Sequence, residues 1–271
     1  MKGLISFLLI LVSFYSCAPN NVTIDNSLGT YFKEAGAEGC FAIMNNGTGE
    51  FTVYNLPRYR DSAFLPASTF KIVNALIGLQ TGVISSDSMV IKWDGVTRQF
   101  PEWNKDLTMY AAFRASADPY FQEVARRIGQ DTMQHWLDTL AYGTKKIKTR
   151  VDTFWLDHSL KITPDEELGL VKRLYFNQLP FFKVNQEAVK NAMVAEKNSA
   201  YTLAYKTGWA PWDGVHKKQI GWVVGWIEEN RHPYFFVLNL ESKDPTFDMP
   251  TVQMRILKSI LQQLRFMQGK Q

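Results

Sequence analysis

Apolar residues form strand-like runs at both ends of the chain and recur with helical spacing between them. Near the start, runs at 40–44 and 51–54 flank a turn of sequence Asn-Asn-Gly-Thr-Gly at 45–49, which is typical of a β-hairpin. Three longer runs, rich in β-branched and aromatic residues, lie near the end, at 201–208, 219–228 and 234–241. The pattern therefore predicts two strands at the start of the chain and three at its end.

Helical periodicity fills the regions between and beyond these strands. The run that follows Pro66 and stops near Gly82 is apolar on nearly all its faces, which is typical of a central, buried helix. The sequence Thr163-Pro164-Asp165-Glu166 is a capping box with proline at the first helical position, and it opens a helix that ends near Tyr175. Other helices are expected at 26–37, 106–115, 119–128, 132–140 and 249–266, and loops at 58–65 and 144–162.

Strands at both ends with helices between them describe an α+β protein. The expected assembly is a five-stranded antiparallel sheet flanked by terminal helices, with a helical subdomain inserted at about 85–195. The 271 residues suffice for a large core. We therefore expect a single domain over 27–271, with a cleft between its sheet and its helical layer.

The N-terminus has the features of an export signal. Lys2 precedes an apolar stretch at 4–15 that is too short to span a bilayer. A signal peptide over 1–16 and a polar tether over 17–26 are therefore expected. The mature protein would then be exported to the periplasm.

Cys17 is the favoured attachment point for a lipid. The sequence Phe14-Tyr15-Ser16-Cys17 resembles a bacterial lipobox, with Phe14 in place of the usual leucine. The alternative is ordinary signal-peptidase cleavage after Ala18, which Pro19 disfavours. Lipidation of Cys17 would attach the protein to a membrane as a lipoprotein.

Charge and composition narrow the class of partner. The net charge is +4, and no run of lysine and arginine reaches the density of a nucleic-acid patch. Aromatic residues make up 14% of the chain, which favours a well-packed body over a disordered one. We expect no nucleic-acid partner, and a slight positive bias suits an anionic small molecule.

Cysteine and histidine give little sign of a metal or a disulfide. If Cys17 is lipidated or removed, Cys40 has no partner, and it is expected to be a small buried hydrophobe. The four histidines lack the spacing of known zinc motifs: His135, His158, His216 and His232. Neither a structural nor a catalytic metal is therefore expected.

Ser68 and Lys71 carry the first chemical signal. They lie three positions apart on a predicted helix, so the hydroxyl and the amine face the same way. Such a pair can activate a serine nucleophile without histidine. Lys71 sits among apolar residues on a helix with little exposed surface, where a bare ammonium is costly and the pKa of an amine falls toward that of a general base.

Lys206-Thr207-Gly208 forms a second candidate at the end of a predicted strand. Gly208 would let another backbone or a ligand approach closely, while Lys206 and Thr207 supply a cation and a hydroxyl. These groups could hold a carboxylate. Taken alone, the tripeptide is better explained as a strand end that carries an exposed lysine.

Several motifs, in order, resemble those of the class D (oxacillinase-type) serine β-lactamases. They are Pro66-Ala67-Ser68-Thr69-Phe70-Lys71, Ser116-Ala117-Asp118, Tyr142-Gly143-Thr144, Trp155-Leu156, Lys206-Thr207-Gly208-Trp209 and Gly221-Trp222-Val223-Val224-Gly225-Trp226. The resemblance covers nearly the whole mature chain. It implies the fold of serine β-lactamases and penicillin-binding proteins, and a β-lactam as the small-molecule substrate.

The resemblance also implies a role for each matching residue. Ser68 would open the β-lactam ring and carry the acyl group, and Ser116 would relay a proton to the leaving nitrogen. Lys71 would be the general base, N-carboxylated by CO2, with no other cofactor. Trp155 would donate its indole N–H to that carbamate.

Substrate binding would fall to the second motif. Lys206 and Thr207 would hold the substrate carboxylate beside Gly208. The backbone N–H groups of Ser68 and Trp209 would form the oxyanion hole. The chain is expected to be a monomer or a homodimer.

Asp118 departs from the family pattern, which mostly has an aliphatic residue at this position. Two interpretations are open. Asp118 precedes Pro119 and could cap the helix that Pro119 begins. Alternatively, its carboxylate approaches Lys71, where an anion would stabilise the ammonium and oppose the charge of a carbamate. The second interpretation predicts weaker carbamylation than is usual.

Two smaller departures concern the third motif and the end of the sheet. Thr144 stands where the family has asparagine, a residue whose role is mainly structural. The family's carboxylate-binding arginine has no counterpart between Glu241 and Pro250, where Lys243 is the one basic residue. Substrate anchoring would then rest more on Lys206 and Thr207.

Two other functions share this nucleophile. A penicillin-sensing domain would be acylated at Ser68 without turnover, but such domains are normally joined to a membrane-spanning signalling module. A D,D-peptidase acting on cell-wall peptides would usually have asparagine at the position of Asp118. An exported β-lactam hydrolase is the favoured function.

Overall fold

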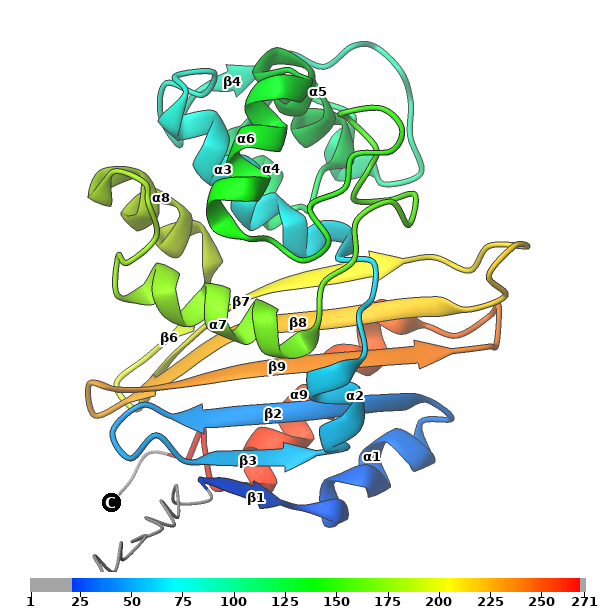
Figure 1. The fold of residues 1–271 in the computed structure, drawn as a ribbon, viewed down its shortest axis with the longest axis vertical. Helices are drawn as coiled ribbons and strands as arrows, with labels where there is room; N and C mark the ends of the chain where they lie inside the picture. The colour runs from blue at the N-terminus through cyan, green and yellow to red at the C-terminus, as the bar shows by residue number, and fades with distance from the viewer. Residues whose placement is uncertain (1–20, 269–271) are drawn as a thin grey trace, which may run out of the picture.

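The computed structural model of the chain describes residues 21–268 and places the helices on both faces of one large sheet (Figure 1). The expected signal peptide over 1–16 and the expected lipidation site Cys17 lie outside the described residues. Within 21–268, none of the helices combines the length and the apolar character that crossing a bilayer requires. The α+β class predicted from the sequence is confirmed.

The sheet has seven strands rather than the expected five, in the order β1-β3-β2-β9-β8-β7-β6. Its strands are β1 (Val22–Ile24), β2 (Glu38–Asn45), β3 (Phe51–Tyr54), β6 (Val194–Lys197), β7 (Tyr201–Ala210), β8 (Gln219–Glu229) and β9 (His232–Ser242). Neighbours pair antiparallel, except that β1 runs parallel to β3. A separate pair joins β4 (Val90–Ile91) to β5 (Leu107–Thr108).

The two strands of the large sheet that sequence analysis missed are its edges, and the separate pair β4 and β5 was not predicted either. Strand β1 is only three residues long and occupies part of the segment expected to be a tether over 17–26, so that expectation is wrong for 22–24. Strand β6 follows a helix directly and reaches only to the part of β7 before Tyr205. Short edge strands lack the alternation that a half-buried central strand needs, so their sequences carry little signal.

The expected helices are present with bounds shifted by a few residues, and the expected helical region also holds α8, for which no separate helix was predicted. The α-helices are α1 (Gly29–Glu34), α2 (Leu56–Asp61), α3 (Lys71–Gln80), α4 (Met109–Arg114), α5 (Asp118–Ile128), α6 (Gln130–Leu140), α7 (Pro164–Tyr175), α8 (Lys183–Met193) and α9 (Met249–Gln263). Short 3₁₀ turns are η1 (Asn26–Leu28), η2 (Ala67–Phe70) and η3 (Pro101–Trp103). Helix α7 begins with the predicted capping box, whereas α2 replaces part of a predicted loop because Asn55 caps it.

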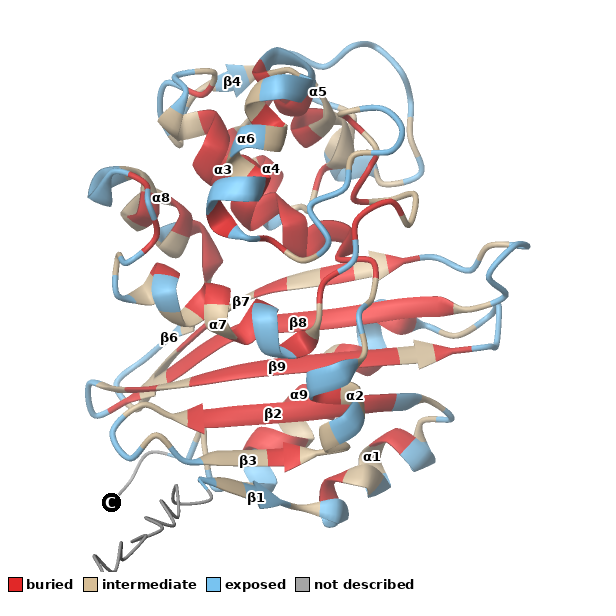
Figure 2. Cartoon of the chain, in the orientation of Figure 1, coloured by how far each residue is buried: buried red, intermediate tan, exposed pale blue. Residues whose placement is uncertain are grey.

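Two apolar cores lie on opposite faces of the sheet. One packs the sheet against α3 to α8, and the other packs it against α1 and α9. Helix α3 is buried from Lys71 to Gly78, which confirms the predicted central helix (Figure 2). Cys40 lies in the first core, and burial raises the pKa of its thiol to about 12, as expected for a small structural hydrophobe. The helical layer meets the sheet mainly through α7, which packs on β8 and β9, and through η2, which packs on β7.

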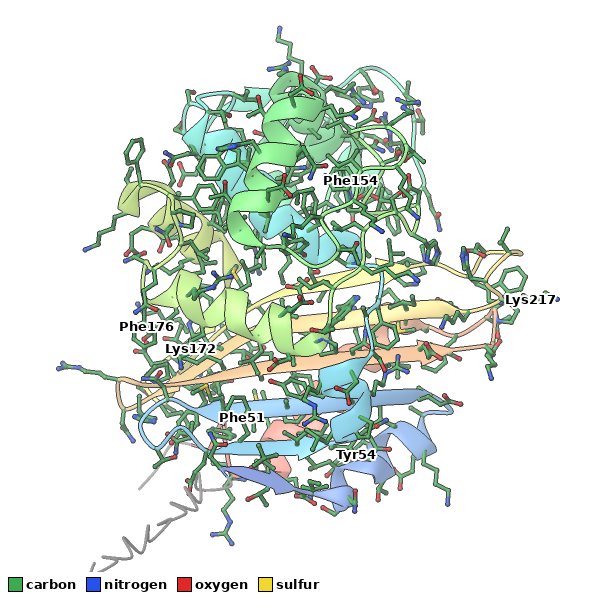
Figure 3. The ribbon with its side chains drawn as sticks, viewed as in Figure 1. Phe51, Tyr54, Phe154, Lys172, Phe176 and Lys217 are labelled. Atoms are coloured by element: carbon green, nitrogen blue, oxygen red, sulfur yellow. The ribbon has the colours of Figure 1, made fainter. Side chains whose placement is uncertain are left out.

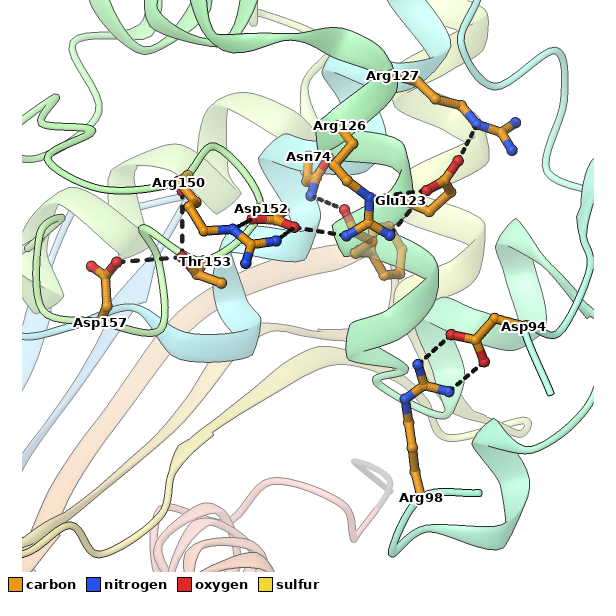
Figure 4. Close-up of polar contacts among 11 residues, drawn as sticks. Asn74, Asp94, Arg98, Glu123, Arg126, Arg127, Arg150, Asp152, Thr153 and Asp157 are labelled. Carbon is orange, nitrogen blue, oxygen red and sulfur yellow. Dashed lines mark hydrogen bonds and ion pairs between the residues drawn. The ribbon is translucent and has the colours of Figure 1, made fainter. Parts of the chain in front are cut away.

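The long loop between α6 and α7 is fastened at several points. Buried Asp152 accepts hydrogen bonds from Arg126 on α5 (2.7 Å) and from Arg150 (2.8 Å) in the loop itself (Figure 4). At its base, Lys161 donates its backbone N–H to Thr144 Oγ1 and accepts the N–H of Thr144. Gly143 has a φ of 49° and lies against the Lys161 carbonyl, where a Cβ atom would clash. Thr144 thus has the structural contacts expected of its motif.

Candidate active site

Ser68 and Lys71 meet where η2 continues into α3. The Nζ atom of Lys71 donates to Ser68 Oγ over 2.5 Å, and both residues are buried. Side chains three positions apart eclipse in a 3₁₀ turn, so the tight turn brings the two groups together even more directly than an α-helix would. Ala67, just before Ser68, has a φ of 50°, a left-handed backbone that costs a non-glycine residue about 1 kcal/mol.

Asp118 provides the counter-ion of Lys71. Its Oδ1 atom forms an ion pair with Lys71 Nζ, and the lysine side chain is fully buried while that of Asp118 is 29% exposed. Helix α5 is capped by Ala117 without a side-chain hydrogen bond, so the interpretation of Asp118 as a helix cap is wrong. The alternative, a carboxylate that approaches Lys71, is confirmed. A buried ammonium needs such a partner, because removing it would leave an uncompensated charge.

Lys206 closes the other side of the site. Its Nζ atom donates to Ser116 Oγ (2.9 Å) and to the carbonyl of Thr207 (2.8 Å), and it lies 5.7 Å from the centre of the Phe113 ring. Burial, and then the positive charge of Lys71, hold the pKa of Lys206 well below its usual range. Ser116 occupies the turn between α4 and α5 with a φ of 52°. The structure therefore brings Ser116 into contact with Lys206, with the charge of Lys71 close enough to act on Lys206.

Gly208 allows β7 to approach the nucleophile turn. A Cβ atom at this position would lie 2.9 Å from the carbonyl oxygen of Pro66 and 3.2 Å from the methyl group of Thr69. Only a residue without a side chain permits this contact between β7 and η2. The sequence-based expectation of a close backbone approach at Gly208 is confirmed.

Strand β7 presents a free edge beside this contact. Strand β6 pairs with β7 only as far as Ala204, so the later residues of β7 have no partner on that side within 21–268. Thr207 directs its carbonyl away from β8, toward Lys206 Nζ. Backbone groups of antiparallel strands alternate in direction, so the N–H of Trp209 points the same way. This edge offers a donor beside Ser68.

Trp155 packs against the nucleophile turn η2. It is fully buried and stacks on Phe70, with ring centres 5.2 Å apart and planes at 26°. Its indole Nε1 finds no hydrogen-bond partner among the residues that the structure describes. Buried donors almost always have a partner, so this N–H marks a place where an acceptor belongs.

A buried network beneath the nucleophile was not predicted. Glu167 on α7 accepts from Thr69 Oγ1 (2.6 Å) and from the hydroxyl of Tyr142 (2.9 Å). Burial raises the pKa of Glu167 to about 7, against the lowering effect of these two hydrogen bonds. Glu167 lies between Pro164 and Leu168 on the apolar stripe of α7, which was the one signal in the sequence that could have revealed it.

The family's carboxylate-binding arginine has no evident replacement. Among residues 21–268, no arginine side chain forms a hydrogen bond or ion pair with the side chain of Lys206, Thr207 or Trp209. Instead, Trp209 donates its indole N–H to buried Gln219 (2.8 Å), which in turn donates to the carbonyls of Asp244 and Phe247. The side-chain amide of Gln219 thus holds the segment after β9 in place through hydrogen bonds.

Comparison with known proteins shows which protein family this chain is similar to. A family model described as the penicillin-binding-protein transpeptidase domain matches residues 39–262. The chain is 36% identical over 252 residues to β-lactamase OXA-5 of Pseudomonas aeruginosa, covering 91% of this chain and 93% of the relative.

Two solved structures share the fold. The class D β-lactamase FUS-1 (OXA-85) of Fusobacterium nucleatum superposes with a TM-score of 0.84 at 34% identity, covering 91% of this chain and 100% of the other. The C-terminal domain of the BlaR penicillin receptor of Bacillus licheniformis superposes with a TM-score of 0.83 at 30% identity, covering 90% and 96%. Similarity of this extent spans both the sheet and the helical layer.

Proposed function

The chain belongs to the class D β-lactamase family, and we propose that it hydrolyses β-lactams through an acyl-enzyme on Ser68. One observation carries the proposal: a buried amine, Lys71 Nζ, lies 2.5 Å from the Ser68 hydroxyl, with Lys206 and Ser116 on the other side. Class D β-lactamases are serine hydrolases of β-lactams, so family membership supports β-lactam hydrolysis as the activity. The role of each residue in that reaction is what we propose.

Acylation would begin at Ser68 Oγ. As its proton passes to the base at Lys71, Oγ bonds to the lactam carbonyl carbon and the ring C–N bond breaks. The leaving nitrogen takes a proton from Ser116, which the hydrogen bond from Lys206 positions. Because the pKa of Lys206 is lowered, this lysine can also exchange the proton that Ser116 gives up.

The oxyanion hole would be formed by the backbone N–H groups of Ser68 and Trp209. The free edge of β7 supports this proposal, because the N–H of Trp209 faces away from β8. The contact between Gly208 and Pro66 supports it too, since it fixes β7 against the nucleophile turn. Each such donor is typically worth about 3 kcal/mol of transition-state stabilisation.

We also propose that Lys71 is N-carboxylated by CO2, and the orphaned indole N–H of Trp155 supports this. A carbamate on Lys71 would supply a carboxylate base where the bare amine is now. Trp155 would donate to it and shield it from bulk water.

Asp118 works against that modification. It stabilises the ammonium form of Lys71, which does not react with CO2, and it would repel a second negative charge. We therefore propose weaker carbamylation than is usual and an activity that depends on added bicarbonate. Full activity in CO2-depleted buffer with a persistently modified lysine would reject this.

A second candidate function is a penicillin-binding trap that is acylated but does not turn over. The Lys71–Asp118 ion pair favours it, because a lysine held as an ammonium is a poor base for deacylation. The likeness to the BlaR receptor domain is consistent with it. A D,D-peptidase is a weaker alternative, because such enzymes usually have asparagine at the position of Asp118.

A chromogenic cephalosporin separates these functions. The expected result for the hydrolase is sustained turnover at many equivalents of substrate, abolished in Ser68→Ala. A single stoichiometric burst, followed by a stable adduct on Ser68, would instead establish the trap or the peptidase. The assay should be run with and without bicarbonate, so that an under-carbamylated hydrolase is not mistaken for a trap.

Export and membrane attachment form a separate proposal. We propose that the chain is exported to the periplasm and lipidated on Cys17, with a lipobox-like sequence as the support. Labelled palmitate should enter the full chain expressed in a bacterium and should be lost in Cys17→Ala. An unlabelled parent chain would reject lipidation without affecting the assignment of Ser68.

A further inference from the structure

Three side chains with metal-binding atoms meet outside the Ser68 site. His158 belongs to the loop between α6 and α7, while Asp213 and His216 belong to the connection between β7 and β8. One ligand atom from each of the three side chains can be chosen so that all lie within 4.8 Å of one another. Figure 3 labels Lys217 in that connection and Phe154 in the loop. Because the two segments are far apart in the sequence, spacing alone gave no sign of this cluster.

The carboxylate of Asp213 is already oriented for binding. Its Oδ1 atom accepts the backbone N–H groups of Val215 (2.9 Å) and His216 (2.5 Å), which fixes the turn. Its Oδ2 atom then faces both imidazoles, 2.9 Å from His216 Nδ1 and 3.5 Å from His158 Nε2. One oxygen is committed to the backbone, and the other is presented between two ring nitrogens.

The two imidazole rings stack face to face. Their centres are 3.6 Å apart and their planes are inclined by 24°. Two protonated rings at this distance would repel each other, whereas neutral rings carry in-plane lone pairs that can bind one cation once the rings rotate out of the stack.

We propose that His158, Asp213 and His216 bind one zinc ion, with solvent completing the coordination. Two imidazole nitrogens and one carboxylate oxygen are a ligand set that zinc and its neighbours in the first transition row prefer over magnesium or calcium. The exposed sides of Asp213 and His216 leave access for water.

The ligand atoms need only a small adjustment. Ligands about 2.0–2.1 Å from zinc in a tetrahedral site lie about 3.4 Å from one another. The two distances from Asp213 Oδ2 already bracket that value, at 2.9 and 3.5 Å. Even the widest pair, within 4.8 Å, would close by no more than about 1.4 Å, which rotation of the His158 and His216 side chains can supply.

The ion would link the two segments that border the catalytic cluster. His158 follows Trp155 by three positions, and the β7–β8 connection begins just after Trp209. Zinc would therefore cross-link the loop that carries Trp155 to the end of the strand that carries Lys206. This inference does not depend on the chemistry at Ser68, because its primary measurement is binding.

Calorimetric titration of the untagged protein with zinc sulfate tests the site. We expect one zinc per chain, no comparable binding of magnesium, and a higher melting temperature with zinc. Each of His158→Ala, His216→Ala and Asp213→Asn should weaken binding by about tenfold or more, since loss of even a supporting partner of a metal ligand has that effect. Asp213→Asn retains the oxygen that accepts the backbone N–H groups, so its fold should be preserved.

His135→Ala is the matched control. His135 is an exposed histidine on α6, outside the cluster, and its loss should leave zinc binding unchanged. Cobalt offers a second readout, because its visible absorption reports nitrogen and oxygen ligands and should disappear in the three cluster variants. A parent chain that takes up no zinc, or variants that bind it as tightly as the parent, would overturn the proposal.

Discussion

The carboxylate of Asp118 forms an ion pair with the Nζ atom of Lys71, the same atom that donates to the hydroxyl of Ser68. A single buried nitrogen is thus shared between a nucleophile and a counter-ion. The pair stabilises the ammonium form, while base catalysis needs a form that accepts a proton. Removing the Asp118 carboxylate should therefore shift Lys71 toward the form that accepts a proton.

Replacing Asp118 with valine should raise the carbamylated fraction of Lys71. Without its counter-ion a buried ammonium is destabilised, so the neutral amine that reacts with CO2 becomes the favoured form. We expect Asp118→Val to need less bicarbonate for full activity than the parent. The carbamate is measured by ¹³C NMR after addition of labelled bicarbonate.

Asp118→Asn is the companion variant, since it removes the charge but keeps a polar group of the same size. Asp118→Asn should also increase the NMR signal of the carbamate, although the asparagine side chain can still form a hydrogen bond with Lys71. If neither variant changes the carbamate signal or the bicarbonate dependence, Asp118 does not control the modification.

Trp155→Phe should lower the carbamylated fraction while preserving the packing on Phe70. Phenylalanine keeps an aromatic face but has no N–H, and a hydrogen bond to a charged group is worth about 1.5–3 kcal/mol. Carbamate affinity should therefore fall by roughly ten- to hundredfold, as measured by the bicarbonate concentration that restores half of the activity. Trp136→Phe on α6 is the control, and an equal shift in both variants would contradict a specific role for Trp155.

Removal of the Ser116 hydroxyl should slow acylation. Proton transfer by a positioned side chain contributes about 10²- to 10⁴-fold, so kcat/KM for a chromogenic cephalosporin should fall by about 10² or more. The backbone at Ser116 is left-handed, with a φ of 52°. Glycine adopts that conformation freely, so Ser116→Gly accompanies Ser116→Ala to separate strain from chemistry.

Ser199→Ala serves as the control for this pair, because Ser199 is an exposed hydroxyl between β6 and β7. If Ser116→Ala and Ser116→Gly retain kcat/KM within about threefold of the parent, Ser116 is not the proton relay, since a relay contributes far more than that.

The buried Glu167 should make the protein less stable as the pH rises. Burial raises the pKa of Glu167 from its ordinary 4.5 to about 7 in the folded protein. Between these pH values the folded chain holds a proton that the unfolded chain has released, so the free energy of unfolding falls with rising pH. The loss is complete above about pH 7 and amounts to roughly 3 kcal/mol.

Urea unfolding at several pH values measures this effect. Glu167→Gln should remove most of the decline between pH 4.5 and pH 7. Glu166→Gln changes an exposed carboxylate on the same helix and should leave most of the decline in place. An unchanged slope in Glu167→Gln would show that Glu167 is ionised in the folded protein across this range.

The nucleophile could be located from sequence because its signal is local. Ser68 and Lys71 lie one helical turn apart in a segment whose apolar pattern demands burial, and their contact depends on that turn alone. The prediction that Ser116 and Lys206 join this pair rested instead on the order of the family's motifs along the chain. No periodicity brings residues 90 positions apart together.

Other contacts were beyond what one sequence can decide. Asp118 before Pro119 fits a helix cap and an inward counter-ion equally well, and the choice depends on how α5 packs on α3. The three proposed zinc ligands belong to two loops, where side-chain direction follows from turn geometry rather than from any repeat. The edge strands β1 and β6 are too short to show alternation.

Intact-protein mass spectrometry during turnover tests the assignment of Ser68 most directly. With a slowly hydrolysed β-lactam, the spectrum should show a transient increase by the mass of one substrate, localised to the peptide that contains Ser68. The adduct should decay as product accumulates, and Ser68→Ala should show neither the adduct nor hydrolysis. Hydrolysis that continues in Ser68→Ala, or an adduct on another residue, would contradict the proposed nucleophile.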